Sequence, residues 1–143
     1  MRNYKLLNNV LGWAVFLIAA VVYTLTLEPT ASFWDCGEYI STSYKLQVGH
    51  PPGAPTFQLL GRFFSLFAFG DVSRVAVMIN MMSALSSAFT ILFLFWTITH
   101  LAKKLVGADL ESPGKMWTVL GAGIVGALAY TFSDSFWFSA VEG

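Results

Sequence analysis

The chain has 143 residues, of which 56% are hydrophobic and only 11% are charged. Soluble domains carry about 25% charged residues, so the composition excludes an ordinary soluble globular protein. Eight Lys and Arg residues balance eight Asp and Glu residues, and the longest basic run is the pair 103–104, which argues against a nucleic-acid partner. Because Cys36 is the single cysteine, the chain has no intrachain disulfide and no Cys/His zinc spacing. An integral membrane protein is the class that remains.

Three apolar runs approach or exceed the roughly 20 residues that cross a bilayer as a helix, at residues 10–27, 75–101 and 116–133. A cleaved signal peptide is the alternative for the first run, since Arg2 and Lys5 precede it. However, the run is long for the core of a signal peptide, and no small-x-small cleavage site follows it closely. We therefore expect an all-α membrane protein with three transmembrane helices.

A fourth run, residues 54–70, is apolar and rich in Phe but carries Gln58 and Arg62. If this run lies in the membrane plane, five of the eight cations fall on the same side as the N-terminus: Arg2, Lys5, Lys103, Lys104 and Lys115. The positive-inside rule favours that arrangement. The pattern predicts an in-plane helix, a cytoplasmic N-terminus and an extracytoplasmic loop over residues 28–74.

Small residues in the third run predict close helix packing. Ala122 and Gly126 are four residues apart, as are Gly123 and Ala127, and such pairs let helices approach each other in lipid. The chain stops at residue 143 without a polar tail, and three helices enclose a site poorly. Residues 1–143 are therefore expected to form the N-terminal part of a longer transmembrane domain.

The loop at residues 28–74 is expected to contain two helices joined by a rigid corner. The first helix is predicted over residues 33–48, with Gly49 as its left-handed C-terminal stop. Consecutive prolines then predict an extended segment over residues 50–55. Pro55 is suited to be the first residue of the in-plane helix.

Two carboxylates on the first loop helix are the main candidates for chemistry. Asp35 and Glu38 are three residues apart, hence on one helix face. A carboxylate at a lipid boundary is energetically costly, which favours a functional role for it. The alternative for Asp35 is a capping box begun by Ser32, in which its carboxylate binds backbone N–H groups. The alternative for Glu38 is a solvated surface acid.

Four further side chains are candidate ligand contacts, each with a structural alternative. His50 suits a proton shuttle, a phosphate contact or a metal ligand, or a local hydrogen bond beside the corner. Arg62 either extends its charge toward the lipid surface or binds a phosphate. Trp34 and Tyr39 either stack on a sugar or serve as ordinary interfacial aromatics.

Together these residues form a more specific pattern. The stretch Phe33-Trp34-Asp35-Cys36-Gly37-Glu38 is followed by Gly49-His50-Pro51-Pro52-Gly53-Ala54-Pro55 and then by Gly61-Arg62. This pattern resembles the GT-C superfamily of membrane glycosyltransferases and, among them, the protein O-mannosyltransferases. It more closely resembles large bacterial O-mannosyltransferase-like membrane proteins, glycosyltransferase family 117. Residues 136–143 also resemble the start of that family's second outer loop.

The resemblance implies transfer of a sugar, with mannose as one candidate, from a polyprenyl-phosphate lipid to a Ser/Thr hydroxyl of an acceptor protein. It further implies a bacterial cytoplasmic membrane with the active loop outside. Within this scheme Asp35 is the base for the hydroxyl, and Glu38 orients the acceptor or tunes Asp35. Arg62, with His50, holds the phosphate, and Glu142 supplies an acid from the second loop.

Two departures from the mannosyltransferase pattern bear on the roles of single residues. The two acids are adjacent in those enzymes but are separated here by Cys36 and Gly37, and Ala54 replaces a basic residue. A divalent cation is used by some GT-C enzymes and not by others, and two acids alone leave that question open. The alternative function is a non-enzymatic membrane transport or assembly module.

Overall fold

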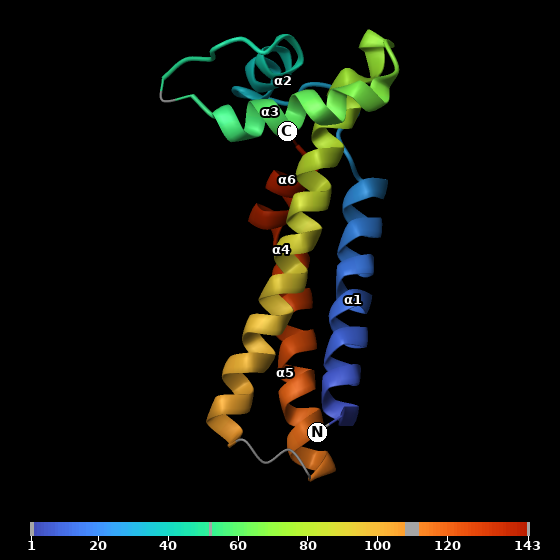
Figure 1. Ribbon diagram of the computed structural model, residues 1–143, viewed down its shortest axis with the longest axis vertical. Helices are drawn as coiled ribbons and strands as arrows, with labels where there is room; N and C mark the ends of the chain where they lie inside the picture. Colours follow the sequence, from blue (N-terminus) through green and yellow to red (C-terminus); the bar gives the residue numbers. More distant parts are fainter. Residues whose placement is uncertain (1, 52, 108–111, 143) are drawn as a thin grey trace. The chain divides into compact units, whose positions relative to one another are not determined.

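The computed structural model describes residues 2–51, 53–107 and 112–142, and within these ranges the chain is helical with no strand (Figure 1). The elements in chain order are α1 (Arg2–Leu25), α2 (Cys36–Lys45), α3 (Pro55–Ser65), η1 (Leu66–Ala68), η2 (Val72–Arg74), α4 (Val75–Val106), α5 (Pro113–Thr131) and α6 (Asp134–Val141). The prediction of an all-α chain is confirmed.

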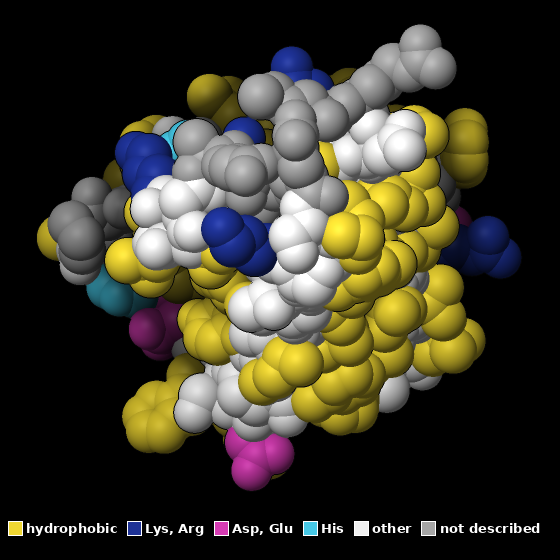
Figure 2. Space-filling model, turned by 90° about the horizontal axis from the view of Figure 1, so that it is seen from below, with side chains coloured by type: hydrophobic (Ala, Val, Ile, Leu, Met, Phe, Trp, Pro, Cys, Tyr) yellow, Lys and Arg dark blue, Asp and Glu magenta, His cyan; other side chains and the backbone are white. Residues whose placement is uncertain are grey.

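Among the residues that the structure describes, two helical segments are long and apolar enough to cross a membrane, Asn3–Leu25 and Val72–Val106. α5 and α6 meet at an angle of 64°. They provide a third crossing only if the pair acts as one broken span. Hydrophobic side chains cover a broad, continuous part of the face shown in Figure 2, as expected for helices that contact lipid. The described helices thus provide two or three spans where the apolar runs predict three.

The long helices extend beyond the apolar runs that predict them. α1 begins eight residues before its run, and α4 continues to Val106, with Lys103 and Lys104 in its last turn. Basic side chains at a helix C-terminus interact favourably with the helix dipole. α5 begins at Pro113, a residue suited to the first helical position because it has no N–H to satisfy.

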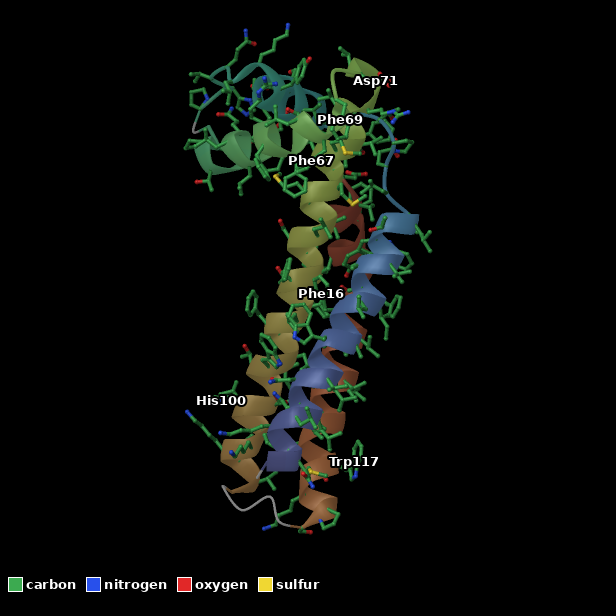
Figure 3. The ribbon with its side chains drawn as sticks, turned by 45° about the vertical axis from the view of Figure 1, so that its right-hand side comes forward. Phe16, Phe67, Phe69, Asp71, His100 and Trp117 are labelled. Carbon is green, nitrogen blue, oxygen red and sulfur yellow. The ribbon has the colours of Figure 1, made fainter. Side chains whose placement is uncertain are left out.

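The described chain divides into two compact units. The first comprises Met1–Val22 and Ser87–Trp137, which hold most of α1, the C-terminal part of α4, and α5. Aromatic rings join α1 to α4 in this unit: Phe16 lies 4.7 Å from Phe89, and Trp13 lies 6.4 Å from Trp96, between ring centroids. Figure 3 labels Phe16, which lies about midway along α1. These contacts fill part of an apolar core that includes Val15, Ala19, Ile91, Phe95, Leu120 and Ala127.

Glycines on α1 and α5 allow close helix contact in the first unit. A methyl group added at Gly12 would lie 2.7 Å from Trp96 Nε1, and one added at Gly123 would lie 2.5 Å from Thr99 Cγ2. Gly126 would similarly meet Ile98. The predicted role of the small residues in helix packing is confirmed for Gly123 and Gly126.

The second unit comprises Tyr23–Ser86 and Phe138–Gly143. Its core packs α2, α3 and η1 against the first turns of α4, and it contains Ile40, Ala68, Val75, Ile79 and Met82. Gly61 on α3 allows this packing, because a methyl group there would lie 2.9 Å from Ser43 Cβ on α2. The loop helices are therefore held as a packed unit.

Candidate active site

α2 is shorter than the sequence predicts. It runs from Cys36 to Lys45 rather than over residues 33–48, and Leu46 ends it in the left-handed conformation with a φ of 50°. The N–H groups of Leu46 and Gln47 bind the last carbonyls of the helix. The predicted stop at Gly49 is therefore wrong. Gly49 instead lies beside a carboxylate, since a methyl group there would be 3.1 Å from Glu38 Oε1.

Asp35 is the residue that precedes α2, and its backbone carbonyl accepts a hydrogen bond from the N–H of Tyr39. Its side chain makes no capping hydrogen bond, so the capping-box interpretation of this acid is wrong. The side chain is 63% exposed. Its carboxylate is thus available to a ligand.

Glu38 and His50 are joined by two short contacts. Glu38 Oε1 accepts a hydrogen bond of 2.8 Å from the backbone N–H of His50, and Oε2 lies 2.8 Å from the imidazole Nδ1. The opposite ring nitrogen, Nε2, lies 3.9 Å from Asp35 Oδ2. The imidazole therefore contacts one carboxylate at each nitrogen, and these three residues form the acid–His–acid cluster.

The corner that carries His50 is a turn rather than an extended segment. The N–H of Gly53 donates a 2.9 Å hydrogen bond to the carbonyl of His50, and Gly53 has a φ of 74°, which glycine adopts without strain. Pro52 lies outside the described residues. The predicted extended corner is therefore wrong at His50 and Gly53, whereas Pro55 does occupy the start of α3.

The contacts within the cluster shift two pKa values in opposite directions. The backbone N–H of His50, followed by its ring, lowers the pKa of Glu38. The hydrogen bond to Glu38, followed by the negative charge of Glu38, raises the pKa of His50. Both shifts favour an imidazolium–carboxylate pair, so the Glu38 carboxylate is a poor proton acceptor.

We expect Glu38→Gln to lower the pKa of His50 toward its ordinary value of about 6.5, because the carboxylate that stabilises the imidazolium is lost. NMR titration of the imidazole signals measures this, and His50→Gln assigns them, since the chain has two His residues. An unchanged midpoint would show that the pair does not form in solution.

The same shifts set the pH range in which the pair stabilises the loop. The pKa of Glu38 is lowered in the folded chain. Its contribution to folding stability is therefore present above the unfolded pKa and is lost as the pH falls through the folded pKa. The pKa of His50 is raised in the folded chain. Its contribution to folding stability is therefore present below the unfolded pKa and is lost as the pH rises through the folded pKa. The pair is therefore strongest between the unfolded values, at about pH 4.3 to 6.5.

Arg62 has partners other than the acid–His–acid cluster. Its Nη1 donates a 2.9 Å hydrogen bond to the carbonyl of Tyr44, and its guanidinium lies 5.4 Å from the centre of the Tyr44 ring. Its Nη1 also lies 3.5 Å from Ser65 Oγ. These contacts join α3 to the end of α2 and fix the spacing of the two loop helices.

The two predicted aromatic contacts differ in their surroundings. Trp34 is 92% exposed and has a φ of 64°, a left-handed conformation that is uncommon for a bulky residue. Tyr39 packs edge-on against Phe57 at 5.5 Å. Trp34 is thus presented to the surroundings directly before Asp35, whereas Tyr39 contributes to the α2–α3 contact.

Glu142 follows α6 and lies near the start of α2. The N–H of Glu28 binds the carbonyl of Val141 at 3.1 Å, which fixes the end of α6 against the beginning of the loop. Burial and then the negative charge of Glu142 raise the pKa of the Cys36 thiol. Within the second unit, the predicted second-loop acid therefore acts electrostatically on the residue next to Asp35.

Asn80 is a positioning residue that the sequence interpretation missed. It is 1% exposed, and its Nδ2 donates to the carbonyls of Glu28 at 2.8 Å and Thr30 at 3.1 Å. It thus fixes the beginning of the loop to α4. A lone Asn within an apolar run is a signal that could have identified it, because an amide in such a place needs a partner.

The described acidic, His and Cys side chains do not by themselves form a metal site. Among the residues that the structure describes, no group of three His, Cys, Asp or Glu side chains is arranged to hold a metal ion.

The long apolar helices and the packed loop between the first two of them define a helical protein of membrane type. Residues 35–143 match the family described as the N-terminal domain of protein O-mannosyl-transferase TMEM260. The chain belongs to this family, and the prediction of an O-mannosyltransferase family is confirmed.

Two relatives carry the name protein O-mannosyl-transferase TMEM260. The mouse protein is 38% identical over 100 residues, which cover 69% of this chain and 14% of the relative. The Dictyostelium discoideum protein is 27% identical over 129 residues, or 90% of this chain and 14% of the relative. The chain thus matches about one seventh of the length of each relative. No solved structure matches the chain.

Proposed function

We propose that this chain is the N-terminal part of a membrane glycosyltransferase that moves a sugar, with mannose as the first candidate, from a polyprenyl-phosphate lipid to a Ser/Thr hydroxyl of a protein. Membership of the family and the names of the mouse and Dictyostelium discoideum relatives support this function. A bacterial cytoplasmic membrane stays a prediction, since both relatives come from eukaryotes.

The exposed Asp35 carboxylate beside the Glu38–His50 pair is the observation that carries the proposal. Asp35 accepts the proton of the acceptor hydroxyl as its oxygen attacks the anomeric carbon of the sugar. The new glycosidic C–O bond forms with inversion while the C–O bond to the lipid phosphate breaks and the phosphate keeps the electron pair. General-base assistance of this kind contributes about 10²–10⁴-fold to the rate.

The departing phosphate needs positive charge rather than an acid, because it leaves as an anion. His50 supplies that charge as an imidazolium that Glu38 stabilises, so Glu38 acts as a positioning residue. Arg62 is the second cation of the proposal, although its contacts with Tyr44 also give it a structural role. Trp34 offers an exposed ring for a sugar face, and Tyr39 and Glu142 complete the proposed substrate contacts.

The proposed topology has the N-terminus in the cytoplasm, residues 28–74 outside, and α2 and α3 in the plane of the membrane. Exposed apolar side chains on α3 and η1 support the in-plane placement of α3, since they suit the lipid boundary: Leu59, Leu60, Phe63, Leu66 and Phe67.

Labelling of single cysteines tests this topology. With Cys36 replaced by Ser, Val48→Cys and Lys104→Cys each provide one thiol at an exposed position. We expect an impermeant maleimide applied to intact cells to label Val48→Cys, and to label Lys104→Cys only after permeabilisation. The opposite pattern would place the candidate site in the cytoplasm and overturn the proposed topology.

A transfer assay tests the proposed reaction. Membranes that contain the protein at its full length are given polyprenyl-phosphate mannose and a Ser/Thr peptide. We expect mannose on the peptide from the lipid donor and none from a nucleotide-linked mannose supplied alone to washed, donor-free membranes. Absence of transfer from the lipid donor would favour the transport or assembly alternative.

A further inference from the structure

A second feature lies in the other unit, far along the sequence from the acid–His–acid cluster. The first turns of α1 and the last turns of α4 line an open cavity of about 270 Å³. Its lining includes Tyr4, Lys5, Asn8, Trp96, His100 and Lys103. The proposed transfer reaction uses none of these residues, so the cavity needs its own explanation.

The lining of this cavity is basic. Lys5 comes from α1, and Lys103 and His100 come from α4, while no Asp or Glu is among the lining residues that the structure describes. The Lys103 ammonium lies 5.4 Å from the centre of the Tyr4 ring, a cation–π contact that orders this long side chain. Figure 3 shows His100 near the C-terminal end of α4. Such a lining attracts an anion.

Two lining residues also carry buried polar atoms that have no hydrogen-bond partner among the described residues, Trp96 Nε1 and Asn8 Oδ1. Gly12, one turn after Asn8 on α1, leaves room for the indole nitrogen, as a methyl group there would be 2.7 Å from it. The indole N–H thus lies against Gly12, which is not among the lining residues. The amide oxygen of Asn8 is an acceptor suited to a hydroxyl, so the lining offers cations for an anion and an acceptor for a hydroxyl.

Apolar side chains beside the cavity indicate where such a ligand comes from. Leu6 and Val10 on α1 are 65% and 55% exposed, and Leu101 on α4 is 54% exposed. Both helices are long and apolar enough to cross a membrane. A basic pocket between membrane helices with apolar flanks suits a lipid headgroup better than a free anion.

We propose that this cavity binds the headgroup of an anionic glycerophospholipid such as phosphatidylglycerol. Lys5, Lys103 and His100 hold the phosphate. Asn8 accepts a headgroup hydroxyl. The bound lipid joins α1 to the end of α4, and this site is independent of the proposed transferase function.

Lipid retention by the purified full-length protein tests the proposal. The protein is stripped of lipid in a neutral detergent and titrated with dioleoyl phosphatidylglycerol or dioleoyl phosphatidylcholine, and bound lipid is counted by native mass spectrometry. We expect the double variant Lys5→Gln/Lys103→Gln to bind phosphatidylglycerol on the order of tenfold more weakly. Binding of phosphatidylcholine should not change.

The matched control is Lys104→Gln/Lys115→Gln, which removes the same charge at two exposed positions outside the lining. It should retain phosphatidylglycerol binding, as should Lys5→Arg/Lys103→Arg, which keeps both charges. Equal weakening by the two Gln pairs would show only general surface attraction and overturn the proposal. Binding of inorganic phosphate as tightly as the lipid would assign the cavity to a soluble anion instead.

Discussion

Replacement of Asp35 by Asn is expected to reduce sugar transfer by about 10²–10⁴-fold, the usual contribution of a positioned general base. The amide is nearly the same size but does not accept the proton of the acceptor hydroxyl. Because Asp35 makes no capping hydrogen bond, the substitution should leave the start of α2 intact. The maximal rate with saturating lipid donor and peptide, measured in membranes that contain the full-length protein, checks this.

Asp71→Asn is the matched control for that experiment. Asp71 is an exposed acid of the same loop, but its carboxylate binds Ser73 and pairs with Arg74 at 3.1 Å. It should therefore leave transfer unchanged. Full activity in Asp35→Asn would show that Asp35 is not the base.

Glu38→Gln should reduce transfer through its effect on His50. It should also move the basic limb of the pH–rate profile to lower pH, a change that mere loss of folding would not produce.

Gly123→Ala is expected to destabilise the first unit by about 1–3 kcal/mol, the usual effect of overpacking. The added methyl group would lie 2.5 Å from Thr99 Cγ2 and 2.9 Å from Phe95 Cε2. Phe95 and Thr99 are 0% and 1% exposed, so neither side chain has room to move away. The midpoint of unfolding in detergent measures the effect.

Gly121→Ala is the control on the same helix. A methyl group there meets nothing within 4 Å, and Ala favours a helix over Gly by up to about 1 kcal/mol. We therefore expect an unchanged or higher midpoint. Gly126→Ala should fall between the two, because its methyl group would meet the flexible end of Ile98 at 2.7 Å. Equal midpoints for all three variants would contradict the close packing of α4 and α5.

The apolar runs predict the long helices because length and hydropathy are local properties of the sequence. Helix ends are less well predicted, since polar residues such as Lys103 and Lys104 continue α4 without interrupting its backbone hydrogen bonds. The end of α2 shows why a simple rule fails there. Leu46 adopts the left-handed conformation that normally favours glycine, whereas Gly49 lies next to the Glu38 carboxylate.

The acids of the candidate site are visible in the sequence, but their partners are not. Spacing places Asp35 and Glu38 on one helix face, yet the pairing of Glu38 with His50 joins residues 12 apart across a turn. No local periodicity encodes such a contact. Arg62 is similar, because its hydrogen bond to Tyr44 depends on how α3 packs against α2. Identity and charge can thus be read along the chain, whereas partnership depends on tertiary packing.

The bridge that Asn80 makes to the carbonyls of Glu28 and Thr30 has a consequence for how this loop tolerates insertions. An added residue between Thr30 and Asp35 would move the Asp35 carboxylate out of its place beside His50. The backbone before it could not shift to compensate, because Asn80 holds it at Glu28 and Thr30. Added residues at the exposed positions 69–71, which follow the buried Ala68, would leave both the bridge and the acids in register. Natural variation in loop length should therefore concentrate after α3 and spare the approach to α2.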